Sequence, residues 1–262
     1  MITDTPYQNL RKTWALLKGL HPQQIALARV DMIRQLDREF FENPNNLIDL
    51  LPKLGLNDEG LDEFPKTLHD YCGSGLRIWQ YPVQFAPYLT LLTQLNIRSY
   101  LELGIRHGGS YVVTVEVLER FMPLEFSIGV DIIPCMSMAV YQNMNPRSRF
   151  VCMNSQSAEF LEFVKSLPFL DLVFIDSHHE ENQCRSEFEL FSQYAQMIAF
   201  HDISNKGCAG IAIVWQEIKA LAGWTCFEFT EQYEGLGSFM GIGLAIKNSR
   251  LAMVNLENIC KI

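Results

Sequence analysis

The sequence predicts an α/β fold in which helices cover both faces of a doubly wound, mostly parallel sheet. After residue 97, short apolar runs alternate with amphipathic stretches, an order typical of parallel strands joined by helices. The runs are continuously apolar, as expected of strands that are buried on both sides. The last two runs, 225–233 and 238–247, are separated by EGLG, so the sheet is expected to end in an antiparallel hairpin.

This pattern predicts seven strands and the helices between them. The expected strands are 99–104, 126–132, 149–154, 170–176, 196–202, 225–233 and 238–247. The expected helices are about 110–121, 134–144, 156–166, 180–194 and 210–221, with one more at 82–95 that runs into the first strand.

The residues before the first strand have a different character. Residues 7–42, which include Trp14, show helical periodicity, whereas 43–75 are rich in proline and glycine turn signals. We therefore expect two parts. An N-terminal helical extension or lid covers 1–80, and the domain that contains the sheet covers 81–262.

The composition is that of a globular protein. Of the 262 residues, 48% are hydrophobic and 19% are charged, which is enough apolar surface to bury a core. The net charge is −9 without a dense Lys/Arg stretch, so neither nucleic acid nor a membrane surface is an expected partner. The seven cysteines include no CxxC pair, and no signal peptide or run approaching the ~20 apolar residues of a membrane span is visible. We expect a cytoplasmic protein with reduced thiols.

The segment ELGIRHGGS (102–110) places three glycines at the end of the first strand, the edge at which open parallel sheets bind ligands. Gly104, Gly108 and Gly109 permit positive φ and a close approach of the backbone to a ligand. The helix that starts near Ser110 offers free N–H groups. The spacing G-x-x-x-G-G differs from the G-x-G-x-x-G of dinucleotide sites. A tight strand–helix turn without a ligand is the alternative.

The second strand ends in a carboxylate, Asp131. A carboxylate at this edge can accept hydrogen bonds from both hydroxyls of a ribose. Because Pro134 follows, Asp131 is equally a candidate for the N-cap of the next helix.

Acidic and imidazole side chains follow the next two buried strands. The fourth strand ends in Asp176, with His178 and His179 just after it, and the fifth ends in His201 and Asp202. Neighbouring parallel strands bring such ends together, so we expect these side chains to form a functional cluster. Taken singly, each is better explained as a helix cap or a solvated loop residue than as a catalytic group.

These segments resemble a known family. ELGIRHGGS resembles motif I of the class I S-adenosylmethionine-dependent methyltransferases. Several further segments resemble one branch of these methyltransferases. They are the pattern D-x-x-H from Asp176, Glu187, the HD after the next strand, GIAIVWQEIK and GIGLAI. That branch contains small-molecule and sugar O-methyltransferases of natural-product pathways and the cephalosporin-hydroxylase-like proteins. The resemblance covers roughly residues 80–247 and implies a Rossmann-like fold.

The resemblance implies S-adenosylmethionine as the cofactor. The positions that match its amino-acid end are Glu102, Gly104, Gly108, Gly109 and Ser110. Asp131 would bind the ribose, and Asp176 would lie beside the cofactor. Gln156 and Ser157 would contact the adenine, although Ser157 is equally a plain helix cap.

In metal-dependent members of the branch, carboxylates at two strand ends hold a divalent ion. The matching residues are Asp176 and Asp202, with His201 as a third ligand. Magnesium prefers oxygen, so His201 favours manganese, iron or another first-row transition ion instead, and absence of a metal is the alternative. A metal would lower the pKa of an acceptor hydroxyl. His179, with His178 as the second candidate, would take its proton.

The resulting prediction is an S-adenosylmethionine-dependent O-methyltransferase, assisted by a divalent metal, that acts on a hydroxyl of a sugar or another natural product. One alternative is a cephalosporin-hydroxylase-like oxygenase with iron held by His179, His201 and a carboxylate. Another is a non-catalytic protein that binds S-adenosylmethionine. The sequence does not identify the acceptor. Helical extensions in this family often form dimers, so a homo-oligomer is one expected state.

Overall fold

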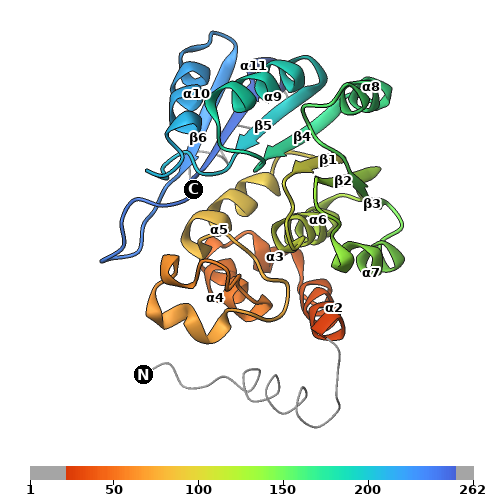
Figure 1. Ribbon diagram of the computed structural model, residues 1–262. Coiled ribbons are helices and arrows are strands. Elements are labelled where there is room, and N and C mark those ends of the chain that lie inside the picture. The colour runs from red at the N-terminus through yellow and green to blue at the C-terminus, as the bar shows by residue number, and fades with distance from the viewer. Residues whose placement is uncertain (1–21, 252–262) are drawn as a thin grey trace.

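The computed structural model describes residues 22–251, which contain a seven-stranded sheet (Figure 1). Its strands are β1 (Ser99–Leu103), β2 (Phe126–Asp131), β3 (Ser148–Cys152), β4 (Leu170–Ile175), β5 (Ala195–Phe200), β6 (Trp224–Phe229) and β7 (Ile242–Lys247). Their order is β3-β2-β1-β4-β5-β7-β6. Strands β1 to β5 pair in parallel, and β7 is antiparallel to both β5 and β6. The predicted fold class and the seven strands are confirmed.

Helices cover both faces of the sheet, as its continuously apolar strands require. One face is covered by α5 (Pro82–Leu92), α6 (Gly109–Phe121) and α7 (Met136–Met144). The other is covered by α8 (Ala158–Ser166), α9 (Glu181–Tyr194) and α10 (Ala209–Ala220). Successive strand residues enter different cores: Tyr100 and Phe174 face the first, whereas Leu101 and Val173 face the second.

The chain before α5 folds into short helices that pack against α5 and α6 (Figure 1). They are α2 (Pro22–Arg34), α3 (Arg38–Phe41), α4 (Pro44–Leu54) and the 3₁₀ helices η1 (Leu61–Glu63) and η2 (Lys66–Tyr71). Residues 7–21 of the expected N-terminal helix, Trp14 included, lie outside the described residues.

Two capping residues divide this part differently from the prediction. The periodic stretch expected to continue to residue 42 is interrupted at Asp37, whose side chain accepts a hydrogen bond from the N–H of Phe40 and caps α3. Asn43-Pro44 was a loop signal in the sequence, but Asn43 caps α4 by accepting from the N–H of Asn45, and Pro44 is the first helical residue. Proline is favoured there because that N–H has no helical partner.

Ion pairs join the N-terminal part to the sheet domain. The guanidinium of Arg34 donates two hydrogen bonds to Glu116 of α6, at 2.7 and 2.8 Å, and Glu116 is buried. Glu59 accepts from Arg106 at 2.8 Å and pairs with Nε2 of His107 at 2.7 Å. Since these two residues belong to the glycine-rich turn, the N-terminal part is attached directly to the segment predicted to bind a cofactor.

Strands β6 and β7 pair as predicted, but EGLG is not their whole connection. β6 ends at Phe229 and β7 begins at Ile242, so residues 230–241 connect the two strands without taking part in their pairing. The buried side chain of Gln84 replaces part of the ladder: it accepts from the N–H of Gly241 at 2.9 Å and donates to the carbonyl of Phe239 at 3.3 Å. This segment is thereby held against α5 instead of forming a tight hairpin.

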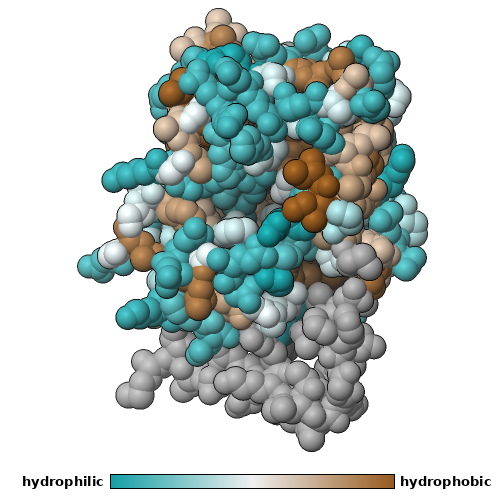
Figure 2. Space-filling model, in the orientation of Figure 1, coloured by the Kyte–Doolittle hydropathy of each residue, from teal (hydrophilic) through white to brown (hydrophobic). Residues whose placement is uncertain are grey.

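None of the helices in residues 22–251 is both long enough and apolar enough to span a membrane. The face shown in Figure 2 is mostly hydrophilic and carries only small hydrophobic patches. Among the exposed large hydrophobic residues are Ile132 and Ile133, which follow β2 and line the pocket described next.

Candidate active site

A pocket of about 610 Å³ opens at the carboxyl edge of the sheet. Residues that follow each of the strands β1 to β5 line it, on both sides of the point where the strand order reverses between β1 and β4. Open α/β sheets bind ligands at this point, and the volume is within the range of small-molecule sites. The N-terminal part contributes Glu63, Arg77 and Trp79, and the β6–β7 connection contributes Phe239 and Met240.

The glycine-rich turn reaches the pocket through Gly104, Gly109 and Ser110. Gly104 has φ of +81°, and a Cβ at this position would lie 1.8 Å from the carbonyl oxygen of Asp176. A Cβ on Gly109 would lie 2.4 Å from the carbonyl oxygen of Leu76. The protein's own packing therefore requires these glycines, whether or not a ligand also approaches them.

Glu102 and Gly108 belong to the predicted cofactor set, but neither lines the pocket. Gly108, with φ of +83°, is the N-cap of α6. Glu102 is fully buried, where it accepts hydrogen bonds from Tyr100 and, at 2.6 Å, from Ser110. Burial raises the pKa of Glu102 to about 8, although these two hydrogen bonds act in the opposite direction.

The raised pKa of Glu102 predicts how stability depends on pH. Between the ordinary value of 4.5 and about 8, the folded protein keeps a proton that the unfolded chain releases. The free energy of unfolding should therefore fall as pH rises through this interval. Glu102→Gln cannot ionise and should remove about 1–3 kcal/mol of that fall. Urea unfolding at several pH values between 4.5 and about 8 measures the free energy of unfolding of both proteins. If the two free energies change with pH in the same way, the buried carboxyl is not protonated in the folded protein.

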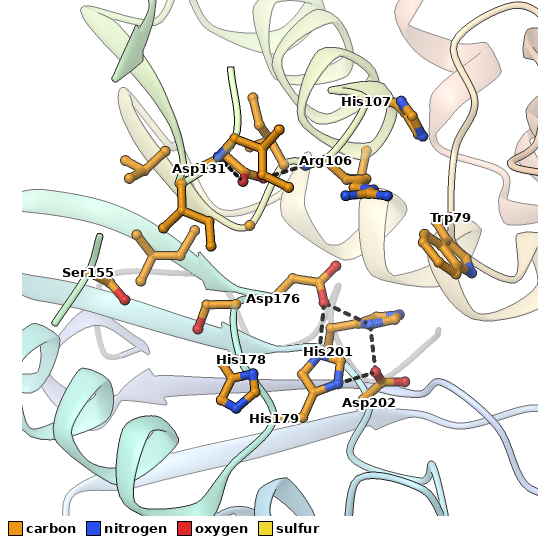
Figure 3. Close-up of a pocket in the computed structure, with 18 of the residues that line it drawn as sticks. Trp79, Arg106, His107, Asp131, Ser155, Asp176, His178, His179, His201 and Asp202 are labelled. Carbon is orange, nitrogen blue, oxygen red and sulfur yellow. Dashed lines mark hydrogen bonds and ion pairs between the residues drawn. The ribbon is translucent and has the colours of Figure 1, made fainter. Parts of the chain in front are cut away.

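Asp131 presents a carboxylate to the pocket (Figure 3). Its Oδ2 accepts from the N–H of Arg106 at 2.8 Å, and its Oδ1 accepts from the N–H of Ile133 at 2.9 Å. Cys135 occupies the N-cap position of α7, so Asp131 closes a turn rather than capping that helix. Each carboxylate oxygen keeps a further lone pair with which to accept a hydrogen bond from a ligand.

The turn after β3 reaches the pocket slightly earlier than predicted. Asn154 and Ser155 line the pocket, whereas Gln156 and Ser157 do not. Ser157 caps α8 through its side chain, the alternative that the sequence left open. Ser155 donates a 2.6 Å hydrogen bond to buried Glu187 of α9. This glutamate therefore fixes the position of Ser155 in the lining of the pocket.

Two carboxylates and two imidazoles from the ends of β4 and β5 converge in the pocket (Figure 3). Asp176 Oδ1 lies 3.1 Å from His201 Nδ1 and 3.6 Å from His179 Nε2. Asp202 Oδ2 lies 3.3 Å from His179 Nδ1 and 3.5 Å from His201 Nδ1. The side chain of His178 is 62% exposed and lies outside this network. We refer to Asp176, His179, His201 and Asp202 as the acid–imidazole cluster.

Opposite charges dominate the electrostatics of the acid–imidazole cluster. Burial alone would raise the pKa of Asp176 and of Asp202, but the charge of His201 keeps both below the ordinary value. Burial alone would lower the pKa of His179 and of His201, but the carboxylates raise both. The Nε2 atoms of both histidines are buried without a hydrogen-bond partner. Unpaired imidazole nitrogens beside carboxylates are a donor set that a divalent cation can use.

Three residues near the cluster lie outside the predicted site. Cys208 Sγ lies 3.0 Å from His179 Nδ1. Trp79 Nε1 donates a 3.1 Å hydrogen bond to Glu63, and both line the pocket. Trp79 and Glu63 belong to the N-terminal part predicted as an extension or lid, but no motif in the sequence singles out any of these three residues.

Comparison with known proteins agrees with this geometry. Residues 67–201 match the family model described as rhamnosyl O-methyltransferase/CmcI. The O-methyltransferase TomG from Streptomyces achromogenes, involved in tomaymycin synthesis and solved in complex with SAM, aligns with a TM-score of 0.50 and 15% identity over 74% of this chain and 92% of its own. Cofactor-bound Rv0187 from MTB aligns with a TM-score of 0.50 and 17% identity over 92% of this chain and 97% of its own. A search of curated proteins found no match.

The sheet order and the two similar solved structures define a Rossmann-like fold of the class I methyltransferase type. The family model covers more than half of the 262 residues. The chain belongs to the rhamnosyl O-methyltransferase/CmcI family and is an S-adenosylmethionine-dependent methyltransferase.

Proposed function

We propose that this enzyme transfers a methyl group to a hydroxyl oxygen of a small molecule, such as a sugar or a polyhydroxylated natural product, with the assistance of a divalent metal ion. The observation that carries the proposal is the acid–imidazole cluster, which shares one pocket with the glycine-rich turn and Asp131. A neutral hydroxyl is a poor nucleophile, so its methylation requires a group that removes the proton.

The residues present fit S-adenosylmethionine. Asp131 offers a carboxylate whose two oxygens are held by backbone N–H groups, which suits the two hydroxyls of a ribose. Gly104, Gly109 and Ser110 would face the amino-acid end of the cofactor, and Ser155 would border its adenine. When bound, S-adenosylmethionine supplies an electrophilic methyl group on a cationic sulfonium.

The residues present also fit a divalent ion. Asp176, His201 and Asp202 offer three donor atoms within 4.8 Å of one another, and one imidazole nitrogen of His201 is buried without a hydrogen-bond partner. Imidazole is a better ligand for first-row transition ions than for magnesium, so His201 favours the former. A bound ion would lower the pKa of an acceptor hydroxyl.

His179 is the residue best placed to accept the proton of the acceptor. Its ring lies in the pocket between Asp176 and Asp202, whose negative charges stabilise the imidazolium that forms when the proton arrives. Its neighbour His178 lacks such partners in the cluster.

The N-terminal part supplies the acceptor side of the pocket. Trp79 offers an apolar ring face and Glu63 offers a carboxylate, a combination that suits a polyhydroxylated ring. We therefore interpret residues 1–80 as an extension that covers the site, and 81–262 as the methyltransferase domain.

Titration calorimetry with S-adenosylmethionine, with and without a divalent metal salt, tests the cofactor assignment. Asp131→Ala should weaken binding at least ~30-fold, because the ribose loses hydrogen bonds to a charged acceptor. Asp62→Ala, which removes an exposed carboxylate that does not line the pocket, should bind like the wild type. A thermal unfolding curve of Asp131→Ala shows whether the loop it anchors remains folded. Wild-type protein that does not bind the cofactor, or a folded Asp131→Ala that binds it normally, would overturn the proposal.

A further inference from the structure

Cys208 adds a thiol to the acid–imidazole cluster. It precedes α10, so it reaches the pocket from a loop and not from a strand end. Its Sγ lies 3.0 Å from His179 Nδ1 and 3.6 Å from Asp202 Oδ2, and these last two atoms lie 3.3 Å apart. Sulfur, nitrogen and oxygen donors therefore form a compact triangle at one side of the pocket.

The size of this triangle matches a tetrahedral metal site. Ligands bound to Zn²⁺ at about 2.0–2.3 Å with tetrahedral angles lie about 3.3–3.6 Å from one another. The two distances to Asp202 fall in this interval, and the 3.0 Å between Cys208 and His179 is about half an ångström shorter than a tetrahedral sulfur–nitrogen pair, so the thiol would move slightly outward when an ion binds. His201 belongs to the other donor group, with Asp176 and Asp202, so the triangle consists of His179, Asp202 and Cys208 alone.

The surroundings prepare Asp202 for this role. Its φ of +63° is a left-handed conformation that costs free energy for a residue with a Cβ, and such strain is concentrated at functional sites. Its Oδ1 accepts a 3.0 Å hydrogen bond from Asn205, which leaves Oδ2 directed at the histidines and the thiol.

The surroundings of the thiol favour its protonated form. Burial raises the pKa of Cys208 to about 12, and the adjacent charge of Asp202 acts in the same direction. A metal ion that binds here must displace the thiol proton to solvent, and its charge would offset that of the carboxylates.

We propose that His179, Asp202 and Cys208 form a binding site for a thiophilic first-row ion of the Zn²⁺ class, and that its occupation competes with methyl transfer. The inference rests on the proposed function, because an ion there would use His179, the proposed base, and Asp202, a proposed ligand of the assisting ion. Thiolate sulfur selects soft and borderline ions and excludes Mg²⁺. The pocket would thus have two alternative states, one with a free base and one with that base held by the ion.

Titration of the full-length protein with Co²⁺, a spectroscopic substitute for Zn²⁺, tests the site. The wild type should develop the near-ultraviolet charge-transfer band of a cobalt–thiolate bond, and Zn²⁺ but not Mg²⁺ should displace the Co²⁺. Cys208→Ser should lose the band and bind Zn²⁺ at least ~10-fold more weakly, since loss of even a supporting residue costs that much. Cys226→Ser, a matched change on β6, should retain both properties. Asp176→Asn should also retain the band, because Asp176 is not one of the three ligands.

A second measurement does not depend on any variant. Zn²⁺ should protect Cys208 of the wild type from alkylation by N-ethylmaleimide, as mapped by mass spectrometry. A wild type without the cobalt–thiolate band, a band that persists in Cys208→Ser, or unprotected Cys208 would overturn the inference. Calorimetry with S-adenosylmethionine on the same preparations keeps the two proposals apart: normal cofactor binding without the band would refute only the thiolate site.

Discussion

His179→Ala is expected to lower kcat for methyl transfer by about 10²–10⁴-fold, the contribution typical of a positioned general base. The ring of His179 lies between Asp176 and Asp202 within the pocket, so its loss removes the proposed proton acceptor and leaves both carboxylates in place. His178→Ala should change kcat less than roughly threefold, because that side chain is 62% exposed and lies outside the cluster. Two adjacent histidines thus provide a matched pair.

The measurement is the release of S-adenosylhomocysteine in the presence of a hydroxylated acceptor that the wild type methylates. Calorimetric affinity for S-adenosylmethionine should stay near the wild-type value in both variants, since neither histidine is assigned to the cofactor. Unchanged turnover in His179→Ala, or a larger loss in His178→Ala, would refute the assignment of the base. A parallel loss of cofactor affinity would indicate that His179 supports the fold of the pocket instead.

Features that depend on local pattern were accessible from the sequence. Continuous apolar runs define buried parallel strands, and polar residues just after such runs must lie at the carboxyl edge of the sheet. That reasoning placed Asp131, Asp176 and the pair His201-Asp202 at one edge, and the structure brings the last three into contact. The strand pairing between β4 and β5 is the reason, because it aligns the two strand ends.

Features that depend on packing between distant segments were not accessible. Glu63 and Cys208 reach the pocket from loops whose paths are set by contacts elsewhere, so no spacing in the sequence indicates them. The resemblance placed Glu102 at the cofactor, whereas Tyr100 and Ser110 enclose its carboxyl beneath the turn. The antiparallel pairing of β6 and β7 was predicted correctly, but the length of their connection was not, because the side chain of Gln84 on α5 binds the segment before β7.

The glycine-rich turn shows how closely fold and site are joined, and Gly104→Ala is expected to lower the free energy of unfolding by more than about 3 kcal/mol. Two causes add at this position. The φ of +81° disfavours any residue with a Cβ, and the new Cβ would lie 1.8 Å from the carbonyl oxygen of Asp176. Relief of that clash requires β1 and β4 to separate where they end, which would move Asp176 away from His201. Denaturant unfolding measures the loss of stability.

Gly235→Ala separates the two causes. Gly235 has nearly the same φ, +80°, but nothing lies within 4 Å of the position where its Cβ would be. That variant should lose only about 1 kcal/mol, the cost of the left-handed backbone alone. Equal losses in the two variants would show that backbone conformation, and not the contact with Asp176, explains the glycine at position 104. A much larger loss of stability in Gly104→Ala would instead mean that the contact with Asp176 requires glycine at position 104. The close approach of the ends of β1 and β4, and with it the position of Asp176, would then depend on a residue that was predicted to approach the cofactor.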